Sequence, residues 1–247
     1  MKTIQCSLIL VLACYFMSSG VIAKTSDPVS NPARVVEELI RPFDKTDAPG
    51  GSVIVIQQGR IIYSRVFGMA NLTHEAAFTL HTPTNIGSTS KQFTALAMVI
   101  LESRGMLSLQ DDVRKFIPEL PDLGHTVRLS HLISHTSGYR EFLNTLAISG
   151  RNLNDPIRRE EIIQIVQNQP TLQNIPGERW NYNNTGYALL AMVVEKVTNM
   201  GFPEWMQKNV FEPAGMNQTR VRRNPGEVIP GMAQGYAPDD DGFREVS

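Results

Sequence analysis

Hydrophobic residues along this chain follow two patterns, one typical of helices and one typical of strands. Residues 92–102 are almost continuously apolar and contain neither Gly nor Pro before Gly105, which predicts a buried helix of about four turns ended by a glycine. A second long apolar stretch, residues 187–197, predicts another helix that stops at Gly201. In residues 33–43 apolar residues recur at helical spacing up to a proline, so an amphipathic helix is expected there.

The strand pattern is found in residues 52–68. Two runs rich in β-branched residues are separated by a short turn that contains Gly59, which predicts an antiparallel β-hairpin. A helix followed by an antiparallel hairpin indicates an α/β protein of the α+β type. A short helix capped by Ser130 is expected further on. Other helices are predicted at residues 158–167 and 202–216, and irregular structure is predicted at residues 69–86 and 225–247.

Composition narrows the possible partners. Of the 247 residues, 42% are hydrophobic and 19% are charged, which is ordinary for a globular protein with a hydrophobic core. The formal net charge of −1 provides no basic surface, so nucleic-acid binding is not expected. After the N-terminal segment, no stretch has the ~18 uninterrupted apolar residues that a membrane-spanning helix needs.

The N-terminal segment has the pattern of a secretory signal peptide. Lys2 precedes an apolar run, and Val21-Ile22-Ala23 follows as a small-residue cleavage pattern. We therefore predict a signal peptide at residues 1–23 and a mature domain at residues 24–247. Such a protein would be exported, either to the periplasm or to the medium.

Both cysteines, Cys6 and Cys14, lie inside this N-terminal segment. The mature protein is thus expected to have no disulfide and no thiolate chemistry, and its stability must come from its core. Lipoprotein anchoring at Cys14 is an alternative, although Leu12 and Tyr15 fit that signal poorly.

The stretch with the clearest chemistry is Gly87-Ser88-Thr89-Ser90-Lys91, directly before the first long apolar helix. Residues three apart on a helix have Cβ atoms ~5–6 Å apart on one face, so Ser88 and Lys91 would present a hydroxyl and an amine together. That pair suits a serine nucleophile with a lysine base. The structural alternative is that Ser-x-x-Lys arose by chance and the serine is only an N-cap.

A second polar motif, Tyr182-Asn183-Asn184, precedes the other long apolar helix. A tyrosine at this place can share a proton with Lys91, and Asn184 can bridge the lysine and a substrate amide. Taken alone, an Asn-rich loop before a helix is more often a turn and a cap. The presence of both motifs, each ahead of a long apolar helix, favours the catalytic interpretation.

With these motifs the chain resembles the superfamily of serine β-lactamases and penicillin-binding proteins, in the branch of class C β-lactamases, D-alanyl-D-alanine carboxypeptidases and related esterases. Ser88-x-x-Lys91 matches its first motif, and Tyr182-x-Asn184 takes the place of Ser-Asp-Asn. The resemblance implies an antiparallel sheet flanked by helices plus a helical subdomain. It covers residues 34–236, and the other matching stretches are residues 52–68, 132–138, 175–190 and 211–216.

The resemblance also implies a role for each of four residues. Ser88 would be the acylated nucleophile, and its backbone N–H would supply half of the oxyanion hole. Lys91 would help to remove the Ser88 proton and must then be neutral, at least transiently. Tyr182 would act as general base or as proton relay to the leaving group, and Asn184 would orient Lys91 and the substrate amide. Whether Lys91 or Tyr182 holds the proton is left open by the sequence.

One motif of the superfamily is not found. Its third motif, Lys/His-x-Gly on a strand, should follow Tyr182, but the later lysines, Lys196 and Lys208, lie in helical patterns and no histidine follows His135. We therefore expect residues 24–247 to be an incomplete serine hydrolase domain of this superfamily, without its C-terminal strands.

Two functions follow as hypotheses. The first is an exported serine hydrolase that forms an acyl-serine intermediate with a β-lactam, a D-Ala-D-Ala-type peptide or a small ester. The alternative is a truncated, non-catalytic relative that binds peptidoglycan or another partner. No cofactor or metal is expected, because the histidines show no metal-binding spacing and His135 lies where the superfamily has a structural turn.

Overall fold

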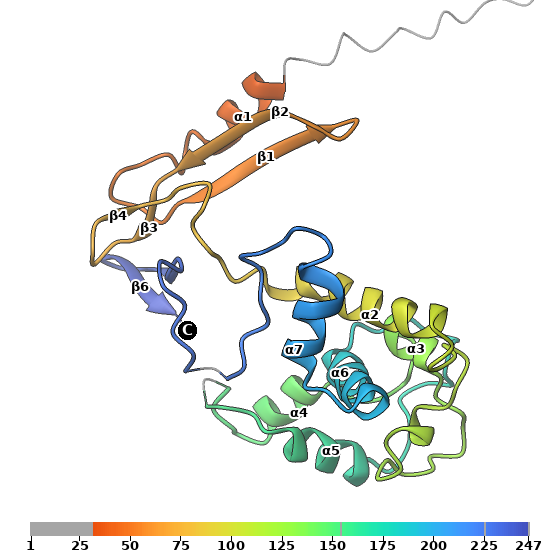
Figure 1. Cartoon of the computed structure of the whole chain (residues 1–247). Coiled ribbons are helices and arrows are strands. Elements are labelled where there is room, and N and C mark those ends of the chain that lie inside the picture. The colour runs from red at the N-terminus through yellow and green to blue at the C-terminus, as the bar shows by residue number, and fades with distance from the viewer. Residues whose placement is uncertain (1–31, 154, 225, 247) are drawn as a thin grey trace, which may run out of the picture.

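The computed structural model describes residues 32–153, 155–224 and 226–246 (Figure 1). The predicted signal peptide and both cysteines lie outside these residues. Helices and three small antiparallel sheets make up the described part of the chain, which confirms the predicted mixture of helices and antiparallel strands. None of the helices described is both long and apolar enough to cross a membrane.

Helices and strands alternate in blocks along the chain. The helices are α1 (Pro32–Ile40), α2 (Lys91–Ser103), α3 (Leu129–Ile133), α4 (Phe142–Ile148), α5 (Arg159–Asn168), α6 (Asn184–Thr198) and α7 (Phe202–Met206), with 3₁₀ turns η1 (Gly87–Ser90) and η2 (Val113–Lys115) and a π-helical turn η3 (Gln207–Phe211). The strands pair as β1 (Gly51–Gln57) with β2 (Arg60–Phe67), β3 (Met69–Asn71) with β4 (Ala76–Ala77), and β5 (Gly235–Asp239) with β6 (Gly242–Val246).

The β1–β2 hairpin confirms the prediction for residues 52–68. Gln58 and Gly59 have φ of 48° and 75°, the positive values that a tight two-residue hairpin turn requires. Helix α1 covers one face of the hairpin, where the Tyr63 hydroxyl donates to the Glu37 carboxylate at 2.6 Å. The opposite face is exposed and apolar, with Ile54, Ile56 and Ile62.

Two further hairpins lie where irregular structure was predicted, so that prediction was wrong. Strands β3 and β4 pair within residues 69–77, and β5 and β6 pair across the acidic run at residues 239–241. The backbone N–H of Leu72 donates to the Tyr236 hydroxyl at 2.8 Å and joins the two hairpins. These strands are short and poor in β-branched residues, so no alternating pattern marks them in the sequence.

The hydrophobic core lies among the helices, with α2 packed against α6 (Figure 1). Met98 and Leu101 of α2 and Leu189 and Val193 of α6 are fully buried. Burying one such side chain is worth about 1.5–3 kcal/mol. Helices α3 and α7 pack on α6 as well, whereas Leu96 on the other side of α2 is exposed. The predicted buried helix is therefore buried on one face.

The observed ends of α2, α6 and α3 agree only in part with the ends predicted from the sequence. Helix α2 ends as predicted at Gly105, which has φ of 68°. Helix α6 begins earlier than predicted, at Asn184, and Asn199 takes the left-handed cap position in place of the predicted glycine. Ser130 lies inside α3, whose N-cap is Arg128, so the prediction of a Ser130 cap was wrong.

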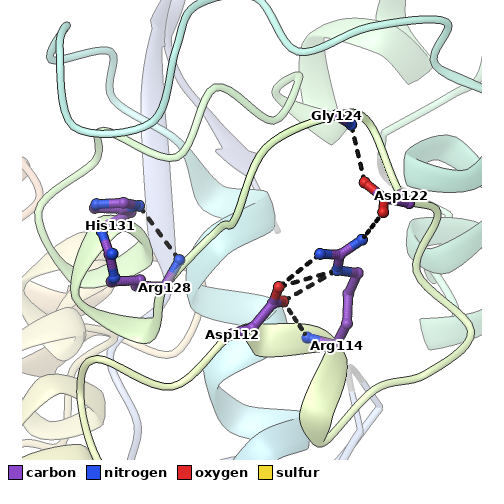
Figure 2. Close-up of polar contacts among 6 residues, drawn as sticks. All are labelled: Asp112, Arg114, Asp122, Gly124, Arg128 and His131. Carbon is purple, nitrogen blue, oxygen red and sulfur yellow. Dashed lines mark hydrogen bonds and ion pairs between the residues drawn. The ribbon is translucent and has the colours of Figure 1, made fainter.

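A cluster of charged residues orders the connection between α2 and α3 (Figure 2). The Asp112 carboxylate pairs with the Arg114 guanidinium at 2.7 Å, and Arg114 also pairs with Asp122 at 2.9 Å. Asp122 accepts a hydrogen bond from the Gly124 N–H, and this bond together with the Arg114 charge lowers the pKa of the Asp122 carboxyl. A β-bridge between Asp112 and Arg128 ties the cluster to the start of α3.

Candidate active site

The 3₁₀ turn η1 presents Ser88 just ahead of helix α2. Gly87 opens the turn with φ of 54°, and its N–H donates to the Asn85 side chain at 2.9 Å. The Ser90 hydroxyl donates back to the Gly87 carbonyl at 2.7 Å. Ser88 is therefore in the turn and not in the helix, while Lys91 is the first residue of α2. The side chains of Ser88 and Lys91 therefore approach each other across the junction between η1 and α2.

The structure brings three of the predicted residues into direct contact. The Lys91 Nζ donates to Ser88 Oγ at 3.0 Å, and the Tyr182 hydroxyl lies 2.6 Å from the same oxygen. The Lys91 ammonium also lies 4.9 Å from the centroid of the Tyr182 ring. Ser88 and Tyr182 are 94 residues apart in the sequence, so this contact is made by the fold.

The electrostatics of the site favour the phenolate form of Tyr182. The hydrogen bonds of the Tyr182 hydroxyl with Lys91 and then with Ser88 lower its pKa from the ordinary value, against smaller opposing effects of burial and of the Glu141 charge. A lowered pKa increases the fraction of phenolate at a given pH. A phenolate at 2.6 Å from Ser88 Oγ is placed to accept the proton of that hydroxyl.

The loop that carries Tyr182 is fixed by the next residue, Asn183. This side chain is only 2% exposed; its oxygen accepts from the Gly186 N–H at 2.8 Å and its amide donates to the Tyr139 carbonyl at 2.6 Å. Asn183 is thus the N-cap of α6 and at the same time a tether to the segment after α3. Gly186 lies close against Leu132, where a side chain would contact the α3 backbone.

Asn184 lies at the site, but its contacts differ from the predicted ones. Its side-chain oxygen is 3.4 Å from the Tyr182 hydroxyl, and its backbone N–H donates to the Glu141 carboxylate. Between Asn184 and Lys91, both within the described residues, there is no hydrogen bond. The predicted role of Asn184 toward a substrate amide stays a prediction.

Three residues at this site were not predicted. Glu141 caps α4 through the Leu143 N–H at 3.0 Å and also holds Asn184. The Tyr187 ring lies 5.5 Å from the Lys91 ammonium. The His135 ring packs on Tyr182 with the ring centroids 4.7 Å apart. No spacing rule connects these residues. Tyr187 begins the apolar stretch that predicted a helix, and His135 lies in residues 132–138, which match the superfamily.

The histidine pair at positions 131 and 135 makes two separate hydrogen bonds. His131 Nδ1 accepts from the Arg128 N–H at 3.3 Å (Figure 2), and His135 Nδ1 accepts from the Asn183 N–H at 3.0 Å. In the part of the chain that the structure describes, no three His, Cys, Asp or Glu side chains are grouped so that they could hold a metal ion.

A cavity of about 750 Å³ adjoins η1 on the side of Gly87 and Ser90. Its wall is mainly apolar and includes Phe93, Phe202 and Phe211. Neither Ser88 nor Tyr182 lines this cavity.

Comparison with known proteins places the chain in a family. The beta-lactamase family matches residues 36–246. The octameric penicillin-binding protein homologue from Pyrococcus abyssi superposes with a TM-score of 0.75 and 31% identity, over 88% of this chain and 50% of that one. The fold is therefore that of penicillin-binding proteins, and the chain belongs to the beta-lactamase family.

Curated relatives agree with this assignment. Penicillin-binding protein 4* of Bacillus subtilis (strain 168) is 32% identical over 212 residues, which are 85% of this chain and 46% of the relative. A D-aminopeptidase of Cereibacter sphaeroides (strain ATCC 17029 / ATH 2.4.9) is 28% identical over 203 residues, 79% of this chain and 39% of that protein. The chain thus spans less than half the length of these relatives.

Proposed function

We propose that this chain carries the nucleophile of a serine hydrolase that works through an acyl-Ser88 intermediate. The observation that supports this proposal is the position of Ser88 Oγ, within hydrogen-bonding distance of both the Lys91 Nζ and the Tyr182 hydroxyl. A serine hydroxyl is a weak nucleophile, and an adjacent base is what activates it.

The contacts support the following order of proton transfers in the proposed reaction. Tyr182, as phenolate, takes the Ser88 proton while Oγ bonds to the carbonyl carbon of the substrate. The lysine ammonium, 3.0 Å from Oγ, stabilises the negative charge that develops there. When the bond between the carbonyl carbon and the leaving group breaks, Tyr182 returns the proton to the leaving nitrogen or oxygen. Water then attacks the acyl carbon while Tyr182 takes the proton of that water. The bond between the acyl carbon and Oγ breaks, and Tyr182 returns the proton to Ser88 Oγ, which releases the acid and restores the phenolate.

For the substrate we propose a β-lactam, a D-Ala-D-Ala-type peptide or a small ester. The relatives support this range, because they include penicillin-binding proteins and D-aminopeptidases. We also propose export, which the pattern of residues 1–23 supports. N-terminal sequencing of the secreted or periplasmic protein should begin at Lys24; an uncleaved N-terminus in the cytoplasm would contradict export.

Covalent labelling tests the acyl-serine proposal. The wild-type chain should be labelled by a fluorophosphonate or a fluorescent penicillin, and Ser88→Ala should lose the label. The matched control is Thr89→Ala, which removes a hydroxyl from an exposed residue of the same turn and should leave labelling in place. Undiminished labelling of Ser88→Ala, or a label that maps to another residue, would refute the nucleophile assignment.

A second candidate is a non-catalytic protein that binds peptidoglycan. After Tyr182 the chain has no Lys/His-x-Gly motif, and Lys196 and Lys208 lie on α6 and η3. Sedimentation with insoluble peptidoglycan distinguishes the two: retention that is equal for wild type and Ser88→Ala, without any labelling, would support the binding protein.

A further inference from the structure

We propose that His135 is a positioning residue, which holds the Tyr182 loop so that the phenol oxygen meets Ser88. This inference rests on the proposed function, because it concerns the group that would take the Ser88 proton. His135 touches neither Ser88 nor any reacting atom, so its effect is exerted through Tyr182.

The backbone on both sides of Tyr182 is bound to the same histidine. The Asn181 N–H donates to the His135 carbonyl at 2.8 Å, and the Asn183 N–H donates to the His135 Nδ1 at 3.0 Å. One residue therefore bonds the chain before and after the tyrosine. Two such bonds restrain the backbone dihedrals that aim the phenol.

The imidazole ring adds a restraint on the side chain itself. It packs against two phenol rings, with centroid distances of 4.7 Å to Tyr182 and 5.1 Å to Tyr187 and interplanar angles of 31° and 36°. The Tyr187 hydroxyl donates to the Ile133 carbonyl at 3.0 Å, so the far side of this stack is itself fixed to α3. The Tyr182 ring thus rests on a surface anchored in the helical core.

His135 must be neutral to accept the Asn183 N–H. Burial, and then the Lys91 charge, lowers the pKa of the imidazole, while the bond to Asn183 and the Glu141 charge oppose this. The titratable groups that face it are Lys91 on α2, Glu141 at the start of α4, Tyr182 and Tyr187. Because the pKa lies below the ordinary histidine value of about 6.5, Nδ1 is an acceptor at neutral pH.

The backbone conformation of His135 shows which substitutions can test its side chain without straining the chain. His135 has φ of 59°, a left-handed conformation that Asn and Gly tolerate better than other residues. In His135→Asn the side-chain oxygen takes the place of Nδ1, whereas His135→Gly keeps the backbone and loses the acceptor. The matched control is His125→Asn, because His125 is an exposed loop residue away from the site.

Two measurements test the proposal. The first is the rate at which a fluorophosphonate labels Ser88, with a bond formed from Oγ to phosphorus and fluoride leaving. We expect His135→Gly to slow it by about 10–100-fold, the size of effect that a misplacement of about 1 Å causes. His135→Asn, which keeps the acceptor but loses the ring contacts, should slow it by less than His135→Gly, and His125→Asn should stay within about threefold of wild type. The second is the ultraviolet difference titration of the Tyr182 phenolate, taken as the difference from Tyr182→Phe in each background. The pKa of Tyr182 should rise toward its ordinary value in His135→Gly and rise by less in His135→Asn, which keeps the acceptor.

The two measurements also separate this inference from the proposed function. A Tyr182 pKa that is the same in His135→Gly and wild type would overturn the positioning role, whatever the acylation rate. An equal loss in His135→Asn and His135→Gly, with far-ultraviolet circular dichroism showing both folded, would overturn the role of the acceptor. If wild type is not acylated but the pKa shifts as expected, the positioning role stands and the hydrolase proposal fails.

Discussion

The helical part of this molecule and its N-terminal hairpin use hydrophobic residues in opposite ways. In α2 and α6 the apolar side chains meet one another, and Leu101, Leu189 and Val193 are wholly buried. In the β1–β2 hairpin, α1 covers one face only, and Ile56 on the other face is 64% exposed. In Figure 1 the hairpin and α1 lie at one end and the helices at the other.

The difference shows what each part can stabilise by itself. A two-stranded ribbon has two faces and cannot bury both without another layer, so it gains little from its isoleucines. Packed helices remove their apolar stripes from water directly. Every residue in contact at the candidate site, from Ser88 to Tyr182 and His135, belongs to the helical part or to its connecting loops. The geometry of the site should therefore depend on the helices far more than on the hairpin.

The largest effect is expected in the helical core. Leu189→Ala should lower the free energy of unfolding by about 2–5 kcal/mol, because it removes buried surface and leaves a cavity. Urea unfolding followed by circular dichroism measures this. Leu189→Met, which conserves volume, should cost less than about 1.5 kcal/mol. A loss for Leu189→Ala no larger than that for an exposed hairpin position would contradict the comparison.

An intermediate effect is expected at the loop that joins the core to the site. Asn183→Ala removes the N-cap of α6 and leaves the buried Tyr139 carbonyl without its donor, which should cost about 1–3 kcal/mol. Asn183→Ser keeps a capping oxygen and should recover part of the loss in the same unfolding measurement. Equal destabilisation by Ala and Ser would show that the cap contributes nothing.

The smallest effect is expected on the open face of the hairpin. Ile56→Thr keeps a β-branched residue at an exposed position of β1 and should change the unfolding free energy by no more than about 0.5 kcal/mol. The Ser88 acylation rate should also be unchanged. Destabilisation as large as that of Leu189→Ala would mean that this face is buried in solution, and the contrast between the two parts would fail.

The sequence predicted the long elements and missed the short ones for physical reasons. The α2 helix and the β1–β2 hairpin have many residues in one hydrophobic period, so the pattern is strong. Strands β3 to β6 have two to five residues each, and their pairing depends on neighbours brought close by the fold, as the Leu72–Tyr236 hydrogen bond shows.

The candidate site divides in the same way. Ser88 and Lys91 could be paired from spacing alone, because residues three apart on a helical turn share a face. Tyr182 was a candidate because its polar motif precedes the other long apolar helix, and the resemblance to a family supplied its role. Spacing could not pair it with Ser88, since 94 residues separate the two. The contacts of Glu141 and Tyr187 had no signal at all, because packing in three dimensions does not depend on a fixed distance along the chain.

What the sequence determined by itself was the long helices, the β1–β2 hairpin and the family. It also predicted the site residues Ser88, Lys91, Tyr182 and Asn184, because all of these follow from local patterns and motifs. Only the tertiary structure decided how the side chains of the site come into contact. The placement of Tyr182 at 2.6 Å from Ser88, with both neighbouring N–H groups bound to His135, requires α3 and α6 to pack together. Such contacts arise from the burial of the common core, and no local pattern records them.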